Sequence, residues 1–252
     1  RLMMNSRTYQ QSSRVTAKHH QIDATNRFLA RMPLQRLDAE ALRDSLLFVS
    51  GRMSLKSGGI PDAVSVSRNG MVSVYPSEEN NHAATHADNG NASIQTASGK
   101  SDSQEAATIA KSEIDACWRR SIYLQYRRTE IATMMDTFDY PQMGPNCLDR
   151  SVSTVSPQAL MMLNDKHVHA LSLSFANRII NMIKNRGLSD SNRTRVDLVY
   201  RMALSRPADP QEIEFGDDSL RKLTKSWHGD ETKALATYCH TIFNTAAFLY
   251  VD

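Results

Sequence analysis

Apolar residues recur at the three- and four-residue spacing of an amphipathic helix in two long stretches of the chain. The first follows Asp38, a residue type that caps helices, and is predicted to end at Gly51, because glycine readily adopts the left-handed conformation that closes a helix. The second is predicted to stop at Gly187. The apolar faces are formed by Leu42, Leu46 and Val49 in the first stretch and by Val168, Leu171, Phe175, Ile179 and Ile183 in the second.

The rest of the C-terminal half has the same helical character. The Ser156-Pro157 pair predicts a helix start, with the serine hydroxyl as cap and proline in the first turn, and a break is expected near Asn164-Asp165. Amphipathic spacing returns over residues 193–204, and further helices are predicted to begin at Asp209-Pro210 and Gly229-Asp230. The pattern therefore predicts a mainly α fold, an irregular helical domain with a C-terminal helical bundle.

The N-terminal half is less regular. Residues 2–10 resemble the end of a helix, so the chain is expected to be a C-terminal piece of a longer protein. Residues 26–30 are predicted to form a helix that Met32-Pro33 breaks, and residues 127–137 another short helix. Residues 64–67 and 71–74 alternate apolar and polar side chains around Arg68-Asn69-Gly70, which predicts one short β-hairpin as the only strand pair.

Residues 77–104 contain almost no large apolar side chain, so they cannot bury enough surface to offset their ordering entropy. They are predicted to form a disordered insertion. The expected organisation is an N-terminal helical part over 1–61, an insertion over 62–110 that holds the hairpin and the low-complexity stretch, and the C-terminal helical bundle of the same domain over 111–252.

Composition narrows the choice of partners. The formal net charge of +3 is too small and dispersed to predict nucleic-acid binding, and no apolar run approaches the ~20 residues that span a bilayer. Cys117, Cys147 and Cys239 form no Cys-x-x-Cys pair and no Cys-x-x-Cys-His motif, so no zinc knuckle and no haem attachment is expected in this chain. Either three buried thiols or one disulfide among them fits this spacing.

The sequence has no strong catalytic signature. It lacks a Gly-x-Ser-x-Gly elbow and a glycine-rich phosphate loop, so no catalytic residue is predicted. No metal ligand is predicted either. His82 and His86 have helical i, i+4 spacing but lie in the polar stretch, and His167 and His169 are expected to face different directions.

Arginines are concentrated in the middle of the chain, beside Trp118, Tyr123 and Tyr126. Their guanidinium groups suit two roles: binding an anion such as a carboxylate or sulfate, or pairing with aspartates, including Asp136, to hold irregular turns between helices. The aromatic neighbours suit either sugar stacking or core packing. The candidate residues for anion binding or inter-helix pairing are Arg119, Arg120, Arg127, Arg128, Arg150, Asp139 and Asp149.

An ordered set of short motifs identifies a family resemblance. Residues 36–40 (RLDAE), 44–47 (DSLL), 118–124 (WRRSIYL), Phe138-Asp139, Cys147, residues 150–154 (RSVST), 157–160 (PQAL) and 248–252 (FLYVD) together resemble the planctomycete domain of unknown function 1553. The resemblance extends over nearly the whole chain apart from the insertion. Ala247 departs from it, since a Glu is expected there in many relatives.

The resemblance implies a setting and not a reaction. Such domains usually lie at the C-terminal end of large exported proteins that also carry a c-type cytochrome segment. A periplasmic or cell-surface location is therefore expected, with upstream domains of the parent chain as partners, c-type haem in that upstream part, and an electron-transfer or glycan-processing partner.

Two functional hypotheses follow. The first is a non-catalytic helical module that holds or docks other domains. The alternative is a component of an enzyme acting on polysaccharides or sugars, with an active site completed by upstream domains. An apolar patch at the N-terminal end would favour the first, and an enclosed polar cleft with convergent acids and arginines would favour the second.

Overall fold

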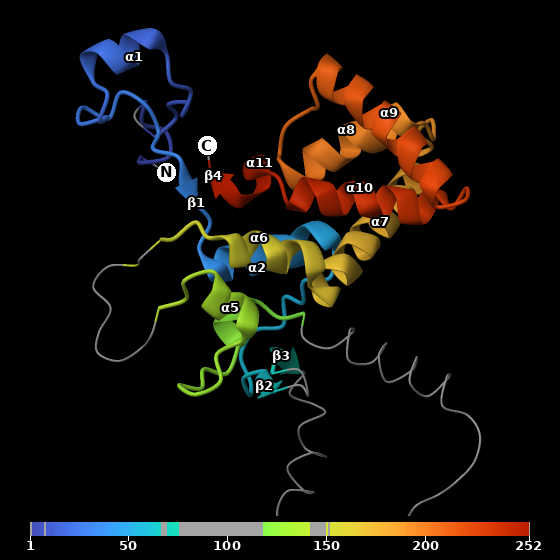
Figure 1. Ribbon diagram of the computed structural model, residues 1–252, viewed down its shortest axis with the longest axis horizontal. Coiled ribbons are helices and arrows are strands. Elements are labelled where there is room, and N and C mark those ends of the chain that lie inside the picture. Colours follow the sequence, from blue (N-terminus) through green and yellow to red (C-terminus); the bar gives the residue numbers. More distant parts are fainter. Residues whose placement is uncertain are drawn as a thin grey trace, which may run out of the picture.

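The computed structural model describes residues 2–7, 9–66, 70–75, 118–141, 150 and 152–251. These residues are mainly helical, as predicted (Figure 1). The predicted low-complexity stretch over 77–104 lies outside them, as do His82, His86, Cys117, Cys147 and Asp149.

The longest helix in the described part, α7 (Lys166–Arg186), is the centre of the C-terminal bundle. Its buried face packs against α10 (Glu231–Phe243), where the rings of Phe175 and Phe243 stack with centroids 5.6 Å apart. The helices α8 (Asn192–Ala203) and α9 (Pro210–Ser226) pack on each other and complete the bundle. Gly216 allows their close approach, since a Cβ there would lie 2.6 Å from Val196 Cγ2.

Helix α2 (Ala39–Ser50) joins the N-terminal half to this bundle, because its apolar face packs against α7. Leu42, Leu46 and Val49 are buried, and Gly51 closes the helix in the left-handed conformation with φ 75°. Gly187 closes α7 in the same way, with φ 61°. The two helices predicted most strongly from the apolar spacing are therefore confirmed.

The short helix α6 (Ser156–Asn164) precedes α7, and Asp165 separates the two where the break was predicted. Ser156 is the first helical residue, so its hydroxyl is not the cap that the sequence predicts. Two histidines bind the last carbonyl groups of α6: His240 Nε2 donates to Met162 O at 2.8 Å and His169 Nε2 to Leu163 O at 2.9 Å. Their rings lie 4.2 Å apart.

The described residues form two antiparallel strand pairs. The predicted hairpin is confirmed as β2 (Ala63–Val66) and β3 (Val72–Tyr75). It is not the only strand pair, because β1 (Gln35–Arg36) pairs with β4 (Tyr250–Val251) close to the C-terminal end (Figure 1). Strands of two residues are too short to produce an alternating pattern, which explains why the sequence does not reveal them.

Other short elements differ from their predictions. Residues 26–30 are not helical: Asn26 and Leu29 have φ of 55° and 52°, and the Asp23 carboxylate holds the turn by accepting the amides of Arg27 and Phe28 at 2.8 Å. The helix in this region is α1 (Ala17–Ile22), which Thr16 caps. Residues 2–6 form turns rather than a helix end. Helix α5 (Thr133–Thr137) covers only the end of the predicted 127–137 segment, and a 3-10 turn, η1 (Ser121–Tyr123), precedes it.

The C-terminal end is packed on the core. The one-turn helix α11 (Ala246–Leu249) buries Phe248, whose ring lies 4.9 Å from that of Phe243. The Leu249 carbonyl accepts the Leu37 amide at 2.8 Å. The last residues therefore tie the segment before α2 to the bundle.

Candidate functional site

Arg119 is buried and holds an irregular loop. Its guanidinium donates to Gly58 O at 2.6 Å, to Ile60 O at 2.8 Å and to Asp62 Oδ1 at 3.2 Å. It also lies over the Tyr123 ring, 4.3 Å from the centroid. Asp62 is almost fully buried, so Arg119 supplies the charge that this carboxylate needs.

Arg120 points the other way, towards α2. Its Nε donates to Asp44 Oδ2 at 3.1 Å, while Asp44 Oδ1 accepts the amide and the hydroxyl of Ser121, both at 2.7 Å. Arg43 adds a buried bond to the carbonyl of Arg119 at 2.8 Å. Helix α2 is thereby bonded to η1.

Arg150 also pairs with α2. Its two Nη atoms donate to the two carboxylate oxygens of Glu40 at 3.0 Å each, in the bidentate geometry that suits guanidinium and carboxylate, and Asp38 lies 3.2 Å away. The structure therefore brings Arg119, Arg120 and Arg150 to the region around α2, where each has an acidic partner. None of these partners is one of the aspartates considered for pairing in the sequence.

Arg127 and Arg128 are not part of this arrangement. Arg127 pairs with Glu130 at 3.0 Å on the exposed turn before α5. Arg128 is exposed and makes no ion pair within the part of the chain that the structure describes. The structure thus separates these two side chains from the other candidate arginines, and Asp149 lies outside the described residues.

Asp139 lies at the centre of a different cluster of hydrogen bonds. It accepts Arg36 Nη2 at 2.8 Å and the amide and hydroxyl of Ser153, both at 2.8 Å, and Gln158 Nε2 lies 3.4 Å away. Burial raises the pKa of the Asp139 carboxyl, but the hydrogen bonds from Ser153 and Arg36 outweigh it, so the pKa lies below its ordinary value. Arg36, which sequence reasoning missed as a site residue, is the first residue of the RLDAE motif.

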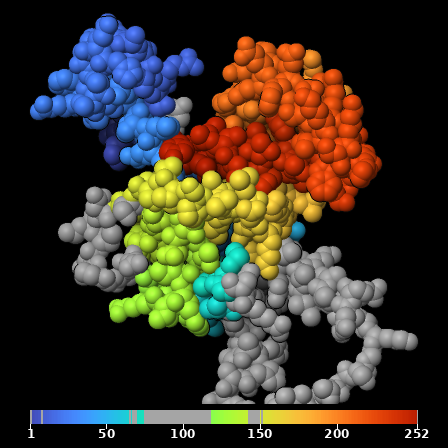
Figure 2. Space-filling model, viewed as in Figure 1, coloured from blue at the N-terminus to red at the C-terminus, as the bar shows by residue number. Residues whose placement is uncertain are grey.

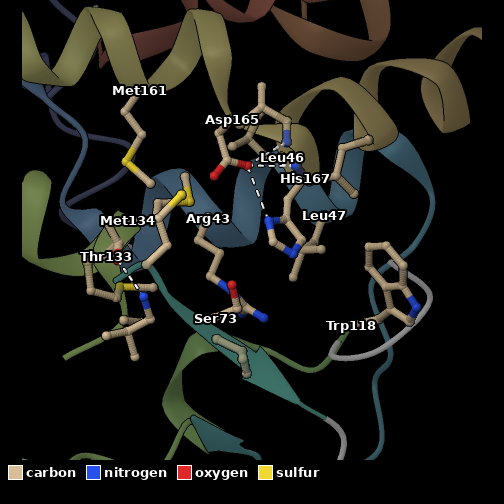
Figure 3. A pocket seen from close by; sticks show the side chains of 17 residues that line it. Arg43, Leu46, Leu47, Ser73, Trp118, Thr133, Met134, Met161, Asp165 and His167 are labelled. Carbon is tan, nitrogen blue, oxygen red and sulfur yellow. Dashed lines mark hydrogen bonds and ion pairs between the residues drawn. The ribbon is translucent and has the colours of Figure 1, made fainter. Parts of the chain in front are cut away.

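An apolar pocket of about 90 Å³ lies between α2, β3, α5 and the start of α7 (Figure 3). Leu46 and Leu47 line it from α2, Met134 from α5 and Met161 from α6, and Trp118 stands at one side. Polar groups reach it at few points, among them Arg43, Asp165 and His167. Such a lining suits a small apolar group and not a charged substrate.

Asp165 and His167 form a carboxylate–imidazole pair at this pocket, with His167 Nδ1 3.3 Å from Asp165 Oδ1. The same oxygen caps α7 by accepting the amides of His167 at 2.7 Å and Val168 at 3.1 Å. Burial raises the pKa of Asp165, but the bond from the His167 side chain and the two amides lower it more, so the carboxyl titrates below its ordinary range. An acid two residues before a histidine at a helix start is the sequence signal for this pair.

The N-terminal segment over residues 2–34, here called the arm, stands apart from the helical body (Figures 1 and 2). Its large apolar side chains have little cover within the described structure. The residues that are more than half exposed are Leu2, Met3, Met4, Tyr9, Ile22, Phe28, Leu29 and Leu34.

The arm is also basic. Residues 2–34 hold five arginines and lysines against the single acid Asp23, a net charge of +4. The excess of basic side chains in this one segment is not visible in the chain's net charge of +3.

A large groove continues the exposed apolar surface from the base of the arm onto the body. It has a volume of about 1110 Å³ and is lined by Leu34 from the arm, Phe48 on α2, Leu55 in the following loop and Val251 on β4, all of them exposed. Its charged side chains are already paired: Arg120 with Asp44, and Arg206 with Glu212 at 2.7 Å. The groove therefore presents an apolar, nearly neutral surface.

Within the described ranges, no cluster of three or more His, Cys, Asp and Glu side chains is arranged to hold a metal ion. Cys239 is a free, fully buried thiol, and burial raises its pKa. None of the described helices combines the length and apolarity needed to cross a membrane.

The model of one protein family matches residues 1–220, and that family is described as a protein of unknown function (DUF1553). This match confirms the resemblance carried by the short motifs. No curated protein and no solved structure matches the chain.

Proposed function

Because the chain belongs to the family described as a protein of unknown function (DUF1553), whose description gives no reaction, we propose from its geometry that it is a docking module. Its arm and the apolar groove beside it bind the upstream domains of the parent protein. The observation that carries this proposal is the row of exposed apolar side chains on a basic arm, continuous through Leu34 with the groove.

The physical basis of this proposal is that exposed apolar side chains are unfavourable in water. So many exposed large apolar side chains in one short segment are unusual on a protein without a partner, and a surface of this kind marks an interaction site. Phe28 and Leu29 lie beside Arg27 and Arg31, so the surface suits a partner that is apolar at its centre and acidic at its rim. An acidic rim speeds encounter, while the apolar centre supplies affinity.

The test is a binding measurement with the upstream part of the parent protein, expressed separately, by isothermal titration calorimetry. Replacing Phe28 with Ser should weaken binding about tenfold or more, as removal of a buried aromatic anchor does. Phe215→Ser is the matched control, since Phe215 is 74% exposed on α9, comparable to 78% for Phe28, but lies on the body away from the arm.

A second measurement uses the arm's own trypsin sites. Cleavage after Arg27 and Arg31 should slow when the upstream part is bound and proceed at the unbound rate in Phe28→Ser. The docking role would be refuted if the unsubstituted chain, Phe28→Ser and Phe215→Ser bound the upstream part with equal affinity, or if none of them bound it.

The wider setting is part of the same proposal. An exported, periplasmic or cell-surface protein with c-type haem in its upstream part, and an electron-transfer or glycan-processing partner, is supported by the family resemblance. This chain has no Cys-x-x-Cys-His motif and its Cys239 is buried, so any haem attachment belongs upstream. Covalent haem staining of the full parent protein after denaturing electrophoresis tests this placement.

One observation favours the alternative, a component of an enzyme acting on polysaccharides or sugars. Asp165 orients His167 at a pocket, an arrangement that suits a general base. Against it, the pocket is small and apolar, and the Asp165 oxygen already caps α7. If the full parent protein degrades a polysaccharide and His167→Gln abolishes that activity while leaving the fold unchanged, this alternative replaces the docking role.

A further inference from the structure

A second groove, separate from the arm and the apolar groove, lies between the end of α2 and the outer face of α7, with a volume of about 630 Å³. Ser50, Gly51 and Arg52 form its α2 side, and side chains of α7, all of them polar except Met182, form the other. Among the described residues, its lining contains no Asp or Glu. The groove is therefore polar and positively charged.

Three asparagines, Asn177, Asn181 and Asn185, form a ladder along the α7 side. Their spacing of four residues puts them on one face of the helix, about 6 Å apart along its axis. Their carboxamides are exposed and make no hydrogen bond with another described residue. Asparagine is a poor helix former, so helix stability gives no reason for three of them on one face.

Arginines hold the groove in shape and supply its charge. Arg178 Nη1 donates to Phe48 O and Val49 O, both at 2.8 Å, so it caps the end of α2. Arg52 Nε donates to Ser174 Oγ at 3.0 Å, and its guanidinium lies over the Trp118 ring at 5.1 Å. Arg186 lies exposed at the end of α7 without an ion pair among the described residues.

We propose that this groove binds an extended acidic peptide segment. In an extended chain, main-chain groups that face the same way recur every two residues, or about 6.6–6.8 Å, close to the ~6 Å pitch of the asparagine ladder. A carboxamide both donates and accepts, so each rung can bind a peptide N–H and C=O. The arginines pair with the acidic side chains, whose charge no lining acid repels.

Other polar ligands fit less well. Single-stranded nucleic acid is bound through aromatic stacking, but the lining of this groove has no aromatic side chain, and Trp118 is covered by Arg52. A single small anion could contact only part of the asparagine ladder, which is about 12 Å long. A sulfated oligosaccharide shares the anionic chemistry and is therefore distinguished by experiment.

The probe is a labelled peptide of about nine alternating Glu and Thr residues, enough to span the ladder in extended form. Its binding to the full chain is measured by fluorescence anisotropy. Two other ligands are measured separately for comparison: the same peptide with Gln in place of Glu, and a sulfated hexasaccharide. The Glu peptide should bind, and the Gln peptide should bind at least tenfold more weakly, because charge-assisted bonds to arginine are lost.

Asn181→Ala, the middle rung, and Arg186→Gln should each weaken binding of the Glu peptide by roughly fivefold to tenfold. Gln211→Ala and Arg193→Gln are matched controls, an exposed carboxamide on α9 and an exposed arginine on α8, and both should bind within about twofold of the parent. Equal binding by the groove variants, equal binding of the Gln peptide, or binding of the hexasaccharide alone would overturn the proposal. Because these variants do not touch the arm, the docking function is tested independently.

Discussion

Arg119 and Arg120 are neighbours in the sequence, yet their side chains have opposite surroundings. The Arg119 side chain is 10% exposed and faces the buried Asp62, whereas the Arg120 side chain is 58% exposed and pairs with Asp44 at the surface. Breaking a buried ion pair leaves a charge without water or partner, while an exposed pair contributes little. The same residue type therefore has two different energetic roles.

We predict that Arg119→Gln lowers the free energy of unfolding by about 3–5 kcal/mol, because Asp62 keeps its buried carboxylate without a cation. Arg120→Gln should lower it by less than about 1 kcal/mol. Urea unfolding followed by circular dichroism measures both. A similar decrease in the free energy of unfolding for both variants would mean that the difference in burial between the two ion pairs does not affect their contribution to stability.

His240 makes stability depend on pH. Burial lowers its pKa, as does the charge of the nearby His169, and these outweigh the Met162 carbonyl, which favours the protonated form. The unfolded state, with an ordinary pKa of 6.5, then binds a proton more readily than the folded state. Stability from this residue is therefore full above that pKa and is lost as the pH falls below it.

We predict that the free energy of unfolding falls by up to about 1.4 kcal/mol per pH unit below the unfolded pKa through this residue. In His240→Gln, which can still donate to the Met162 carbonyl, the decrease between about pH 7.5 and pH 5.5 should be smaller. Urea titrations at several pH values measure it. An unchanged pH slope in the variant would contradict the assignment.

At the scale of elements, glycine ends both α2 and α7, but the two ends differ in what surrounds them. A Cβ on Gly51 would lie 2.9 Å from Arg178 Cδ, whereas no atom of the described residues lies within 4 Å of the same position at Gly187. Gly51 thus serves both the left-handed backbone and the arginine that caps α2. Gly187 serves the backbone alone.

We predict that Gly187→Ala costs about 1 kcal/mol from backbone strain and that Gly51→Ala costs more, because Arg178 must also move from the α2 carbonyls. Chemical denaturation of both variants gives the difference. If both substitutions lower the free energy of unfolding equally, then Arg178 can move without cost and its hydrogen bonds to the α2 carbonyls add no measurable stability.

In the whole molecule, the segment before α2 lies beside the C-terminal end of the described chain. The β1–β4 pair and the bond from Leu37 to Leu249 join the start of α2 to the end of the chain. Phe248, 5% exposed, fills the core beneath this joint against Phe243. The last residues therefore belong to the packed structure.

We predict that Phe248→Ala lowers the free energy of unfolding by about 3–5 kcal/mol through the cavity it leaves. The exposed neighbour in β4 is the control: Val251→Thr should change stability by no more than about 0.5 kcal/mol. Thermal unfolding monitored by calorimetry compares them. A fully stable Phe248→Ala would mean that the C-terminal end is a separate docking peptide.

The elements whose signals are local could be predicted from the residue pattern alone. Apolar spacing at i, i+3 and i+4 with a terminal glycine located α2 and α7, proline and aspartate located the start of α9, and alternation located the hairpin, because each signal lies within one turn or strand. The family resemblance also came from short motifs, and the family match confirms it.

Which side chains meet depends on the packing of segments that lie far apart in the chain. Arg36 and Asp139 bond although 103 positions separate them, and Arg150 reaches Glu40 across 110. The two-residue strands β1 and β4 exist only because packing brings them together. Ion-pair partners, the apolar groove and the groove between α2 and α7 all depend on contacts between distant segments. A linear pattern of residues does not encode which of many equivalent charges will be neighbours.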